Sequence, residues 1–345
     1  MHRPERPTPL ARKFHRKRRP PKLPRSTPGG EHRPVLLDEV LKALDPRPGQ
    51  TVVDATLGFA GHSAAVLQRL GPTGLLIATD LDAASIPQAT EKLEALRLPF
   101  QVFHSNFAGL PGVLAQAGVA YVDALLADLG MSSMQVDDPA RGFSFMRDGP
   151  LDMRMDRTRG RTAADLVNTL TYEELAAAFA EFGDEPHAET IAAAIVLERS
   201  NRPFETTRQL RETIDAAAPV QLLLGPGYPP VHKQKLLPAT RVFQSLRILV
   251  NRERANLTQL LRVLPDILKP GGTAALVSFH SGEDRLVKAA FRDGLRAGVY
   301  AAVSGDPIRP SEEEKAANPR ARSAKLRWAR RAVPGETVPP PDSED

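Results

Sequence analysis

The amino-acid sequence predicts an α/β fold in which a doubly wound parallel sheet is interrupted by an inserted all-helical region. Three observations lead to this prediction. Short apolar runs alternate with stretches of helical periodicity as far as residue 134. Between residues 135 and 238, helical stretches follow one another without strand-like runs, and after residue 239 a strand signal returns. The length of 345 residues is enough for about two to three domains.

The first part of the sheet, residues 31–134, is expected to hold four strands and the helices between them. The expected strands are short apolar runs, and the expected helices have apolar residues three and four positions apart. We predict strands at residues 51–55, 75–80, 99–104 and 122–128, and helices at residues 62–70 and 83–96.

The insertion, residues 135–238, is expected to be helical and to recognise the substrate. Helices are predicted at residues 173–182, 188–199 and 207–217, and a Pro/Gly-rich loop at residues 225–230 marks the return path. Residues 239–333 then complete the sheet domain. They are predicted to form one long amphipathic helix at residues 241–268, closed by the Lys-Pro-Gly-Gly sequence of residues 269–272, and a strand at residues 273–279.

The composition excludes several classes of protein. Hydrophobic residues make up 41% of the chain and charged residues 25%, and no apolar run approaches the roughly 18–20 residues that cross a bilayer. The chain has no cysteine, which excludes disulfides, thiolate zinc sites, iron–sulfur clusters and a cysteine nucleophile. No apolar segment of secretory type follows the basic N-terminal residues. We expect a cytoplasmic protein without a membrane partner.

The two ends of the chain have unusual compositions. Residues 1–30 hold ten Lys/Arg, one acid and seven prolines, which predicts a disordered basic tail. Two interpretations stay open: an arm that binds nucleic-acid phosphates, or a solubilising extension. An organellar transit peptide is less favoured because the prolines interrupt an amphipathic helix. Residues 334–345 are acidic and Pro-rich and are expected to be disordered.

The first predicted strand runs into a turn of small residues that is typical of a ligand site. Gly58 and Gly61 let backbone N–H groups and a helix N-terminus approach a ligand. No third glycine completes a dinucleotide fingerprint, so pyrophosphate binding is less favoured. Asp80 ends the second strand, where an acid can accept the two hydroxyls of a ribose. Asp82 is as easily explained as a helix cap.

Two further segments carry candidate functional residues. Asp128 ends the fourth strand at the edge where open α/β sheets bind ligands, and it could hold an amine or cap the next helix. Residues 141–156 interleave Arg and Asp with aromatic residues and methionines. That pattern suits a nucleic-acid surface, although structural salt bridges explain any one of these residues equally well.

Together these segments resemble one family closely. The chain is similar to the RsmH (MraW) family of S-adenosylmethionine-dependent methyltransferases, which methylates the N4 amine of a cytidine in small-subunit (16S) ribosomal RNA. The strings that match lie in the family's order and leave only the basic tail and the loop at residues 222–235 outside the pattern. They are residues 32–39, 54–63, 127–135, 141–156, 239–247, 278–288 and 318–327.

The resemblance implies a Rossmann-like class I methyltransferase sheet and a set of contacts with S-adenosyl-L-methionine. Asp80 would bind the ribose hydroxyls, Phe107 would lie against the adenine, and the backbone at residues 60–62 would approach the methionine part. The implied cofactor residues are Ala60, Gly61, His62, Asp80, Phe107, Asp128 and Gln135. The chain departs from the family at Ala60, usually Gly, and at Gly282, usually Leu. We expect Ala60 to permit close approach at a negative φ, and Gly282 to loosen the turn that holds His280.

The implied reaction needs little acid–base chemistry, because the sulfonium already makes its methyl group electrophilic. Asp128 is the candidate catalytic residue, as an acceptor for the N–H of cytosine N4. Phe143, Phe145 and His280 are hypotheses for stacking on the base. We expect no metal, since the histidines lack ligand spacing. The implied partner is 16S ribosomal RNA in the small subunit, at the decoding region, and a homodimer stays open.

Three competing functions are less favoured. A nicotinamide-dependent dehydrogenase would share the sheet but needs the missing third glycine. A non-catalytic ribosome-assembly factor could bind RNA through the basic tail and through residues 320–331, which hold six Lys/Arg and no acid. Methylation of a protein or small molecule fits the cofactor turn but gives the basic tail no partner.

Overall fold

The computed structural model describes residues 33–218 and 237–336. The predicted basic tail, the loop at residues 225–230 and most of the acidic end lie outside the described residues. No helix within the described ranges is both long enough and apolar enough to cross a bilayer.

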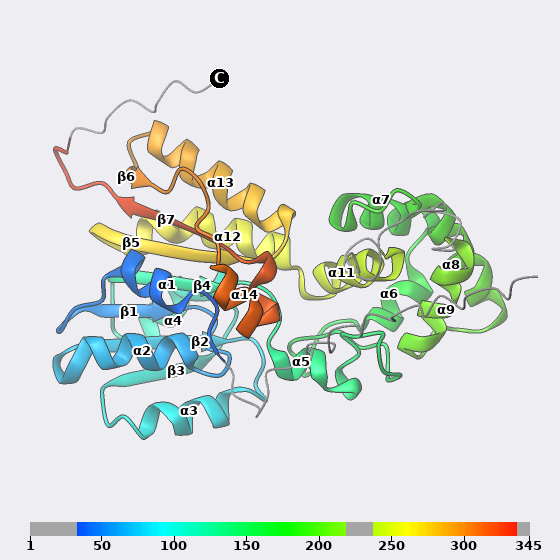
Figure 1. The fold of residues 1–345 in the computed structure, drawn as a ribbon, viewed down its shortest axis with the longest axis horizontal. Helices are drawn as coiled ribbons and strands as arrows, with labels where there is room; N and C mark the ends of the chain where they lie inside the picture. The colour runs from blue at the N-terminus through cyan, green and yellow to red at the C-terminus, as the bar shows by residue number, and fades with distance from the viewer. Residues whose placement is uncertain (1–32, 219–236, 337–345) are drawn as a thin grey trace, which may run out of the picture.

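Figure 1 shows a mixed α/β unit beside a smaller helical unit. The α/β unit contains a seven-stranded sheet with the order β3-β2-β1-β4-β5-β7-β6. Neighbours from β3 to β5 are parallel, and β7 is antiparallel to both β5 and β6. The strands are β1 (Thr51–Asp54), β2 (Leu75–Asp80), β3 (Phe100–His104), β4 (Val122–Asp128), β5 (Leu268–Ser278), β6 (Tyr300–Val303) and β7 (Lys325–Arg331). The predicted doubly wound sheet is confirmed.

Helices cover both faces of the sheet because successive strand residues point to opposite sides. Val52 packs into the core on one face, and Val53 into the core on the other. The first face is covered by α1 (Leu37–Leu44), α2 (Gly61–Leu70) and α3 (Ile86–Glu94), and the second by α4 (Leu110–Gln116), α12 (Glu253–Ile267) and α13 (Ser281–Arg296). Short helices complete the unit: η1 (Gly71–Thr73), η2 (Phe107–Gly109), α14 (Glu312–Ala317) and η5 (Pro319–Ser323).

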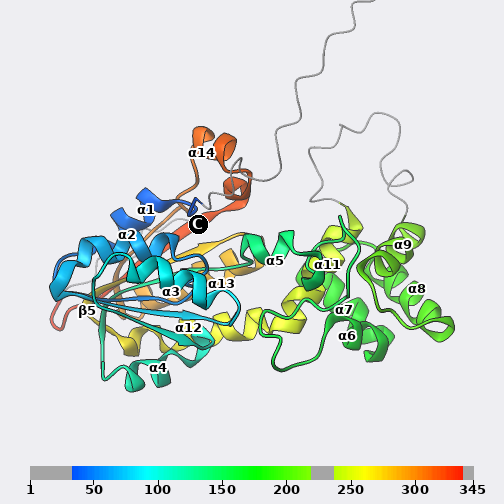
Figure 2. The same cartoon turned by 90° about the horizontal axis from the view of Figure 1, so that it is seen from below.

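The helical unit has a core of its own. It contains α6 (Ala163–Thr169), α7 (Tyr172–Gly183), α8 (Ala188–Asn201), α9 (Thr207–Ala217) and α11 (Pro238–Asn251). Capping boxes begin three of these helices, at Thr162, Thr171 and Thr206. The chain reaches the unit through α5 (Ser133–Asp137) and η3 (Pro139–Arg141) and leaves it along α11, as Figure 2 shows from below. The three helices predicted here are confirmed.

The prediction of one helix at residues 241–268 is wrong. The chain breaks at Arg252, which has a left-handed φ of 52° between α11 and α12. Apolar residues of α11 pack in the helical unit, whereas those of α12 pack under the sheet. Both halves are amphipathic, so the apolar spacing continues across the break and hides it.

The late strands also differ from the prediction. The strand β5 starts at Leu268, so the Lys-Pro-Gly-Gly sequence expected to close a helix lies inside the strand, beside a register shift. Sequence analysis missed β6 and β7. In β7 the apolar residues alternate with Lys and Arg, and this pattern resembles a basic surface segment more than a strand.

Candidate active site

The carboxyl ends of the parallel strands open into one cavity, where doubly wound sheets bind ligands. Its wall includes the turn after β1, the ends of β2 to β5, and the junction of α11 with α12. Six of the seven predicted cofactor residues line it: Gly61, His62, Asp80, Phe107, Asp128 and Gln135. The seventh, Ala60, is fully buried and does not line the cavity.

Buried hydrogen bonds hold the turn after β1 in place. Asp54 accepts hydrogen bonds from the backbone N–H of Thr56 (3.1 Å) and from the hydroxyl of Ser63 (2.6 Å). The hydroxyl oxygen of Thr56 in turn accepts the backbone N–H of Asp128 (2.6 Å). Burial raises the pKa of Asp54 against the opposing effects of Ser63 and His62. The first turn is therefore tied directly to the end of β4.

Ala60 corrects one expectation. It is the N-cap residue of α2 and has φ 55°, in the left-handed region, rather than the negative φ that we expected. The left-handed conformation costs an L-residue about 1–2 kcal/mol. Ala60 therefore carries strain that a glycine at this position would not.

Asp80 lies at the end of β2 and already accepts two backbone hydrogen bonds. The N–H groups of Gly58 and Asp82 each donate to one of its carboxylate oxygens at 2.7 Å. Burial raises the pKa of Asp80 despite these two donors. Each oxygen keeps a lone pair for a ligand in the cavity. Phe107 begins η2 at the end of β3 and borders the same cavity.

Asp82 has a role that sequence analysis missed. One of its oxygens accepts hydrogen bonds from Gln135 (3.0 Å) and Arg141 (2.7 Å), and all three side chains are buried. Arg141 also donates to the backbone carbonyls of Arg154 and Met155, each at 3.0 Å. This ion pair ties the segment leading to the helical unit to the end of β2. The Arg141 guanidinium is thus committed to a structural contact rather than to a nucleic-acid surface.

Asp128 is the carboxylate at the centre of the site. Its Oδ1 atom is buried and has no hydrogen-bond partner among the described residues. Its Oδ2 atom lies 3.7 Å from Nδ1 of His62. Burial raises the pKa of Asp128 to about 6, with Asp54 and Glu283 adding to the rise and His62 opposing it. Oδ1 is therefore closed off from the cavity, and Oδ2 is the oxygen that an N–H of a ligand can reach.

The opposite wall of the cavity comes from segments that sequence analysis did not assign to it. Asn251 and Glu253 lie at the break between α11 and α12, and Phe279 and Glu283 follow β5. The string of residues 278–288, which resembles the family, was the sequence feature that could have pointed to Phe279 and Glu283. Phe143 and Phe145, which were hypothesised to stack on the base, do not line the cavity. Phe143 is buried in the core of the helical unit, and Phe145 packs edge-on against Phe243 at 5.1 Å.

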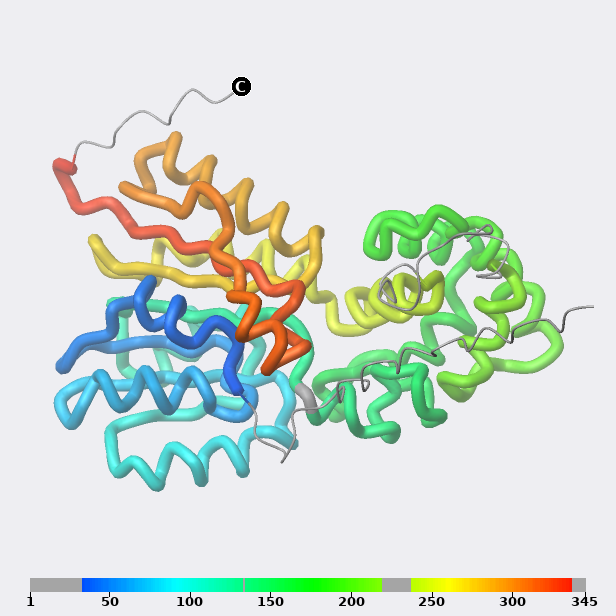
Figure 3. Tube along the Cα trace, viewed as in Figure 1, coloured from blue at the N-terminus to red at the C-terminus, as the bar shows by residue number. Residues whose placement is uncertain are grey.

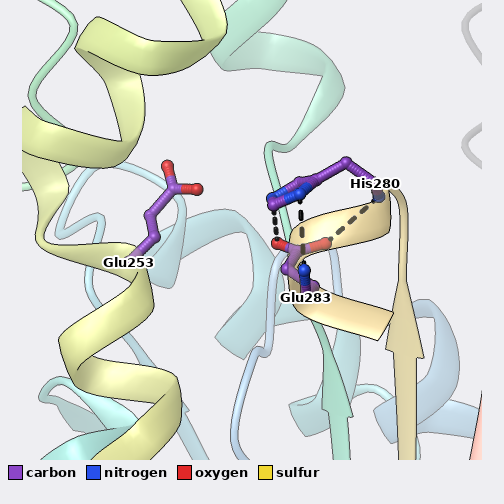
Figure 4. Close-up of side chains that lie close together, drawn as sticks. All are labelled: Glu253, His280 and Glu283. Atoms are coloured by element: carbon purple, nitrogen blue, oxygen red, sulfur yellow. Dashed lines mark hydrogen bonds and ion pairs between the residues drawn. The ribbon is translucent and has the colours of Figure 1, made fainter. Parts of the chain in front are cut away.

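Figure 4 shows Glu253, His280 and Glu283 close together beside this wall. One ligand-type atom from each lies within 4.8 Å of the others. Both carboxylates already accept hydrogen bonds from other residues of the protein. Arg247 donates to both oxygens of Glu253, at 2.8 and 2.9 Å. Glu283 accepts the N–H of Phe279 at 2.9 Å and forms a capping box with His280 at the start of α13.

Gly282 makes room for His280 rather than loosening it. A Cβ atom at residue 282 would lie 3.1 Å from Nδ1 of His280, which is closer than ordinary contact. The ring is fixed by the capping box, in which Nδ1 accepts the backbone N–H of Glu283 at 3.4 Å. His280 Nε2 is buried and lies 3.2 Å from a carboxylate oxygen of Glu283.

The chain is similar to a known family along most of its length. The sequence model of the MraW methylase family matches residues 29–332. A protein of Citrifermentans bemidjiense named ribosomal RNA small subunit methyltransferase H is 45% identical over 311 residues, which cover 86% of this chain and 97% of that protein. The protein of the same name from Acidobacterium capsulatum is 45% identical over 304 residues, with the same coverage. A solved structure of a putative rRNA-methylase from Clostridium thermocellum is 12% identical, with a TM-score of 0.40, covering 86% of this chain and 93% of that one.

Proposed function

This chain belongs to the MraW methylase family, and we propose from that premise that it methylates the exocyclic N4 amine of a cytidine in 16S ribosomal RNA. Its methyl donor is S-adenosyl-L-methionine. The names of relatives that match 86% of the chain support ribosomal RNA as the substrate. The proposal places the target in the decoding region of the small subunit and the enzyme in the cytoplasm.

The cavity has the groups that the cofactor needs. Asp80 would accept the ribose hydroxyls through the lone pairs that its two backbone donors leave free. Phe107 would pack against the adenine, and Gln135 would use the amide hydrogen that it does not donate to Asp82. The backbone of Gly61 and His62, at the start of α2, would approach the methionine part. When bound, the cofactor supplies an electrophilic methyl group.

The carboxylate of Asp128 in the wall of the cavity is the observation that carries the proposal. Its accessible oxygen, Oδ2, has no hydrogen bond within the protein and can accept one from a ligand donor. The N4 amine of cytosine is such a donor, and its lone pair is delocalised into the ring. Accepting an N–H at Asp128 would favour a pyramidal nitrogen with its lone pair directed at the methyl group. Asp128 would therefore position the nucleophile and accept its proton.

No metal is needed in this proposal, since the reacting methyl group is already activated by a positive sulfur. Glu253 and Glu283 have protein partners of their own, as described above. The assembly-factor alternative is not favoured either. Several cations of residues 320–331 are neutralised within the protein: Lys325 and Arg327 both bind Asp284, and Arg330 binds Glu336.

The test is methyl transfer from labelled S-adenosylmethionine to small ribosomal subunits that lack N4 methylation. Asp128→Asn removes the carboxylate and keeps the shape of the side chain. Asp293→Asn is the matched control, because Asp293 is exposed on α13. We expect Asp128→Asn to lower kcat at least about 100-fold and Asp293→Asn to behave as wild type. Full activity of Asp128→Asn would contradict the role given to Asp128.

A further inference from the structure

The side chain of His62 is fixed in one orientation. Its Nε2 atom lies 2.9 Å from the backbone carbonyl oxygen of Val35. A carbonyl oxygen only accepts, so Nε2 must carry a hydrogen. The other ring nitrogen, Nδ1, then faces Oδ2 of Asp128 at 3.7 Å. The cofactor contacts implied by the family use the backbone at this position and leave the imidazole without a role.

Few charged groups surround this pair. Asp54 on β1 and Glu283 on α13 act on Asp128 from the neighbouring elements, and both oppose its ionisation. His62 on α2 is the group that favours the carboxylate. Asp54 is itself held by Ser63 and Thr56, and Glu283 by the capping box of α13. His62 is therefore the neighbour placed to exchange a proton with Asp128.

We propose that His62 is a positioning residue for Asp128 and that the two side chains accept the proton of the substrate amine as a pair. This inference rests on the proposed function and extends it. The Val35 carbonyl holds the imidazole so that Nδ1 faces the carboxylate, in the way that a third group orients the base in other catalytic sites. Oδ2 of Asp128, the oxygen that reaches the cavity, then lies between the imidazole and the amine.

The proton and the charges balance in this step. The N4–CH3 bond forms as the bond from the methyl carbon to sulfur breaks and leaves its electron pair on sulfur. N4 then carries a positive charge and releases a proton to Oδ2 of Asp128. The pair changes from one negative charge to none, the sulfur loses its positive charge, and the methylated base ends neutral. Either member of the pair can hold the proton that the amine releases.

Two substitutions separate this role from a structural one. In His62→Gln the longer amide can still donate to the Val35 carbonyl but leaves no nitrogen toward Asp128. In His62→Asn the shorter amide can donate to Asp128 but loses the Val35 contact. A purely structural His62 predicts that His62→Gln is the milder change. The proposed pair predicts that His62→Asn is the milder one.

The first readout is the titration of the Asp128 carboxyl, followed by NMR in protein labelled with carbon-13 at aspartate, with Asp128→Asn to assign the signal. This measurement needs no RNA. In His62→Gln we expect the midpoint to move up from about 6, by about one pH unit, because the group that favours the carboxylate is lost. In His62→Asn we expect a midpoint close to wild type. An unchanged midpoint in His62→Gln overturns the proposal.

The second readout is the pH profile of kcat for methyl transfer. We expect the acid limb of His62→Gln to move to higher pH, so that its loss of activity is larger at pH 6.5 than at pH 8.5. A loss equal at all pH values indicates a structural role and overturns the proposal. If wild-type protein makes no N4-methylcytidine, the proposed substrate is wrong, and the NMR titration still decides whether His62 and Asp128 are paired.

Discussion

At the scale of single residues, Asp128 combines features that favour function over stability. Its carboxylate lies at the end of β4 with one oxygen unpaired, and burial raises its pKa to about 6. The residue was predictable because a strand-ending acid in a doubly wound sheet faces the ligand. Glu283 was not predictable as its neighbour, since it comes from a separate part of the chain and no spacing relates the two.

The raised pKa of Asp128 predicts that removing its carboxylate raises stability and lowers activity. The folded state binds this proton more tightly than the unfolded state, so the group reduces stability as pH rises from about 4 to about 6. At pH 8 we therefore expect Asp128→Asn to stabilise the fold, by at most about 3 kcal/mol, while strongly reducing transfer. The gain should vanish near pH 4. Urea unfolding at both pH values tests this, and destabilisation at pH 8 would contradict the burial argument.

Ala60 predicts a second stability effect. Its left-handed φ of 55° is relieved in Ala60→Gly, although glycine also gains entropy in the unfolded state. We expect a net stabilisation of up to about 1 kcal/mol and tighter or unchanged cofactor binding. The matched control is Gly118→Ala, where φ is 71° and no atom crowds the new Cβ. That change should destabilise by about 1 kcal/mol. Thermal unfolding of both variants tests these two expectations. A loss of stability in Ala60→Gly would contradict the strain assigned to Ala60.

At the scale of elements, the break between α11 and α12 brings Asn251 and Glu253 into the wall of the cavity opposite the first turn. The four early strands were predictable because they are apolar runs. The break was hidden because the apolar spacing continues through it, and β7 was hidden because its buried positions include Arg327, paired with Asp284. Apolar patterns thus locate buried strands, whereas a single left-handed residue or a buried ion pair leaves little trace in them.

Asn251 holds this break against the segment that follows Arg141. Its side chain accepts the N–H of Met155 (2.7 Å) and donates to the carbonyl of Met153 (2.8 Å), and it is buried. Asn251→Ala leaves both groups unpaired, and we expect a loss of about 2–4 kcal/mol in unfolding free energy. Thr258→Ala, on the exposed face of α12, should change stability by less than about 0.5 kcal/mol. Equal effects in urea unfolding would contradict the role of Asn251.

The contacts of Glu253, His280 and Glu283 predict a response to metal removal. Arg247 and the start of α13 already partner the two carboxylates. We therefore expect EDTA treatment to leave Tm and the Kd for S-adenosylmethionine unchanged. A fall in Tm that one divalent cation restores would identify this cluster as a metal site and contradict the prediction.

At the scale of the whole molecule, the cavity lies where the two units meet. Figure 3 shows that the chain leaves the sheet after β4, passes through the helical unit and returns along α11. The Asp82–Arg141 ion pair fixes the outgoing segment, and Asn251 fixes the returning one. A substrate base entering the cavity would therefore meet side chains from both units.

The basic segment of residues 1–30 predicts a salt effect at this scale. Its ten Lys/Arg, accompanied by a single acid, can neutralise RNA phosphates and release counterions. Deleting it should weaken binding to small subunits and flatten the dependence of log K on log salt concentration, with no change in cofactor affinity. An unchanged salt slope would show that the segment is not an RNA-binding arm.

The most direct test of the central claim is the identity of the product. Small subunits lacking N4 methylation are incubated with the protein and S-adenosylmethionine, and their RNA is digested to nucleosides for mass spectrometry against authentic standards. We expect N4-methylcytidine, formed by wild type and strongly reduced with Asp128→Asn. A methyl group on a ring carbon, on a ribose oxygen or on another base would contradict it.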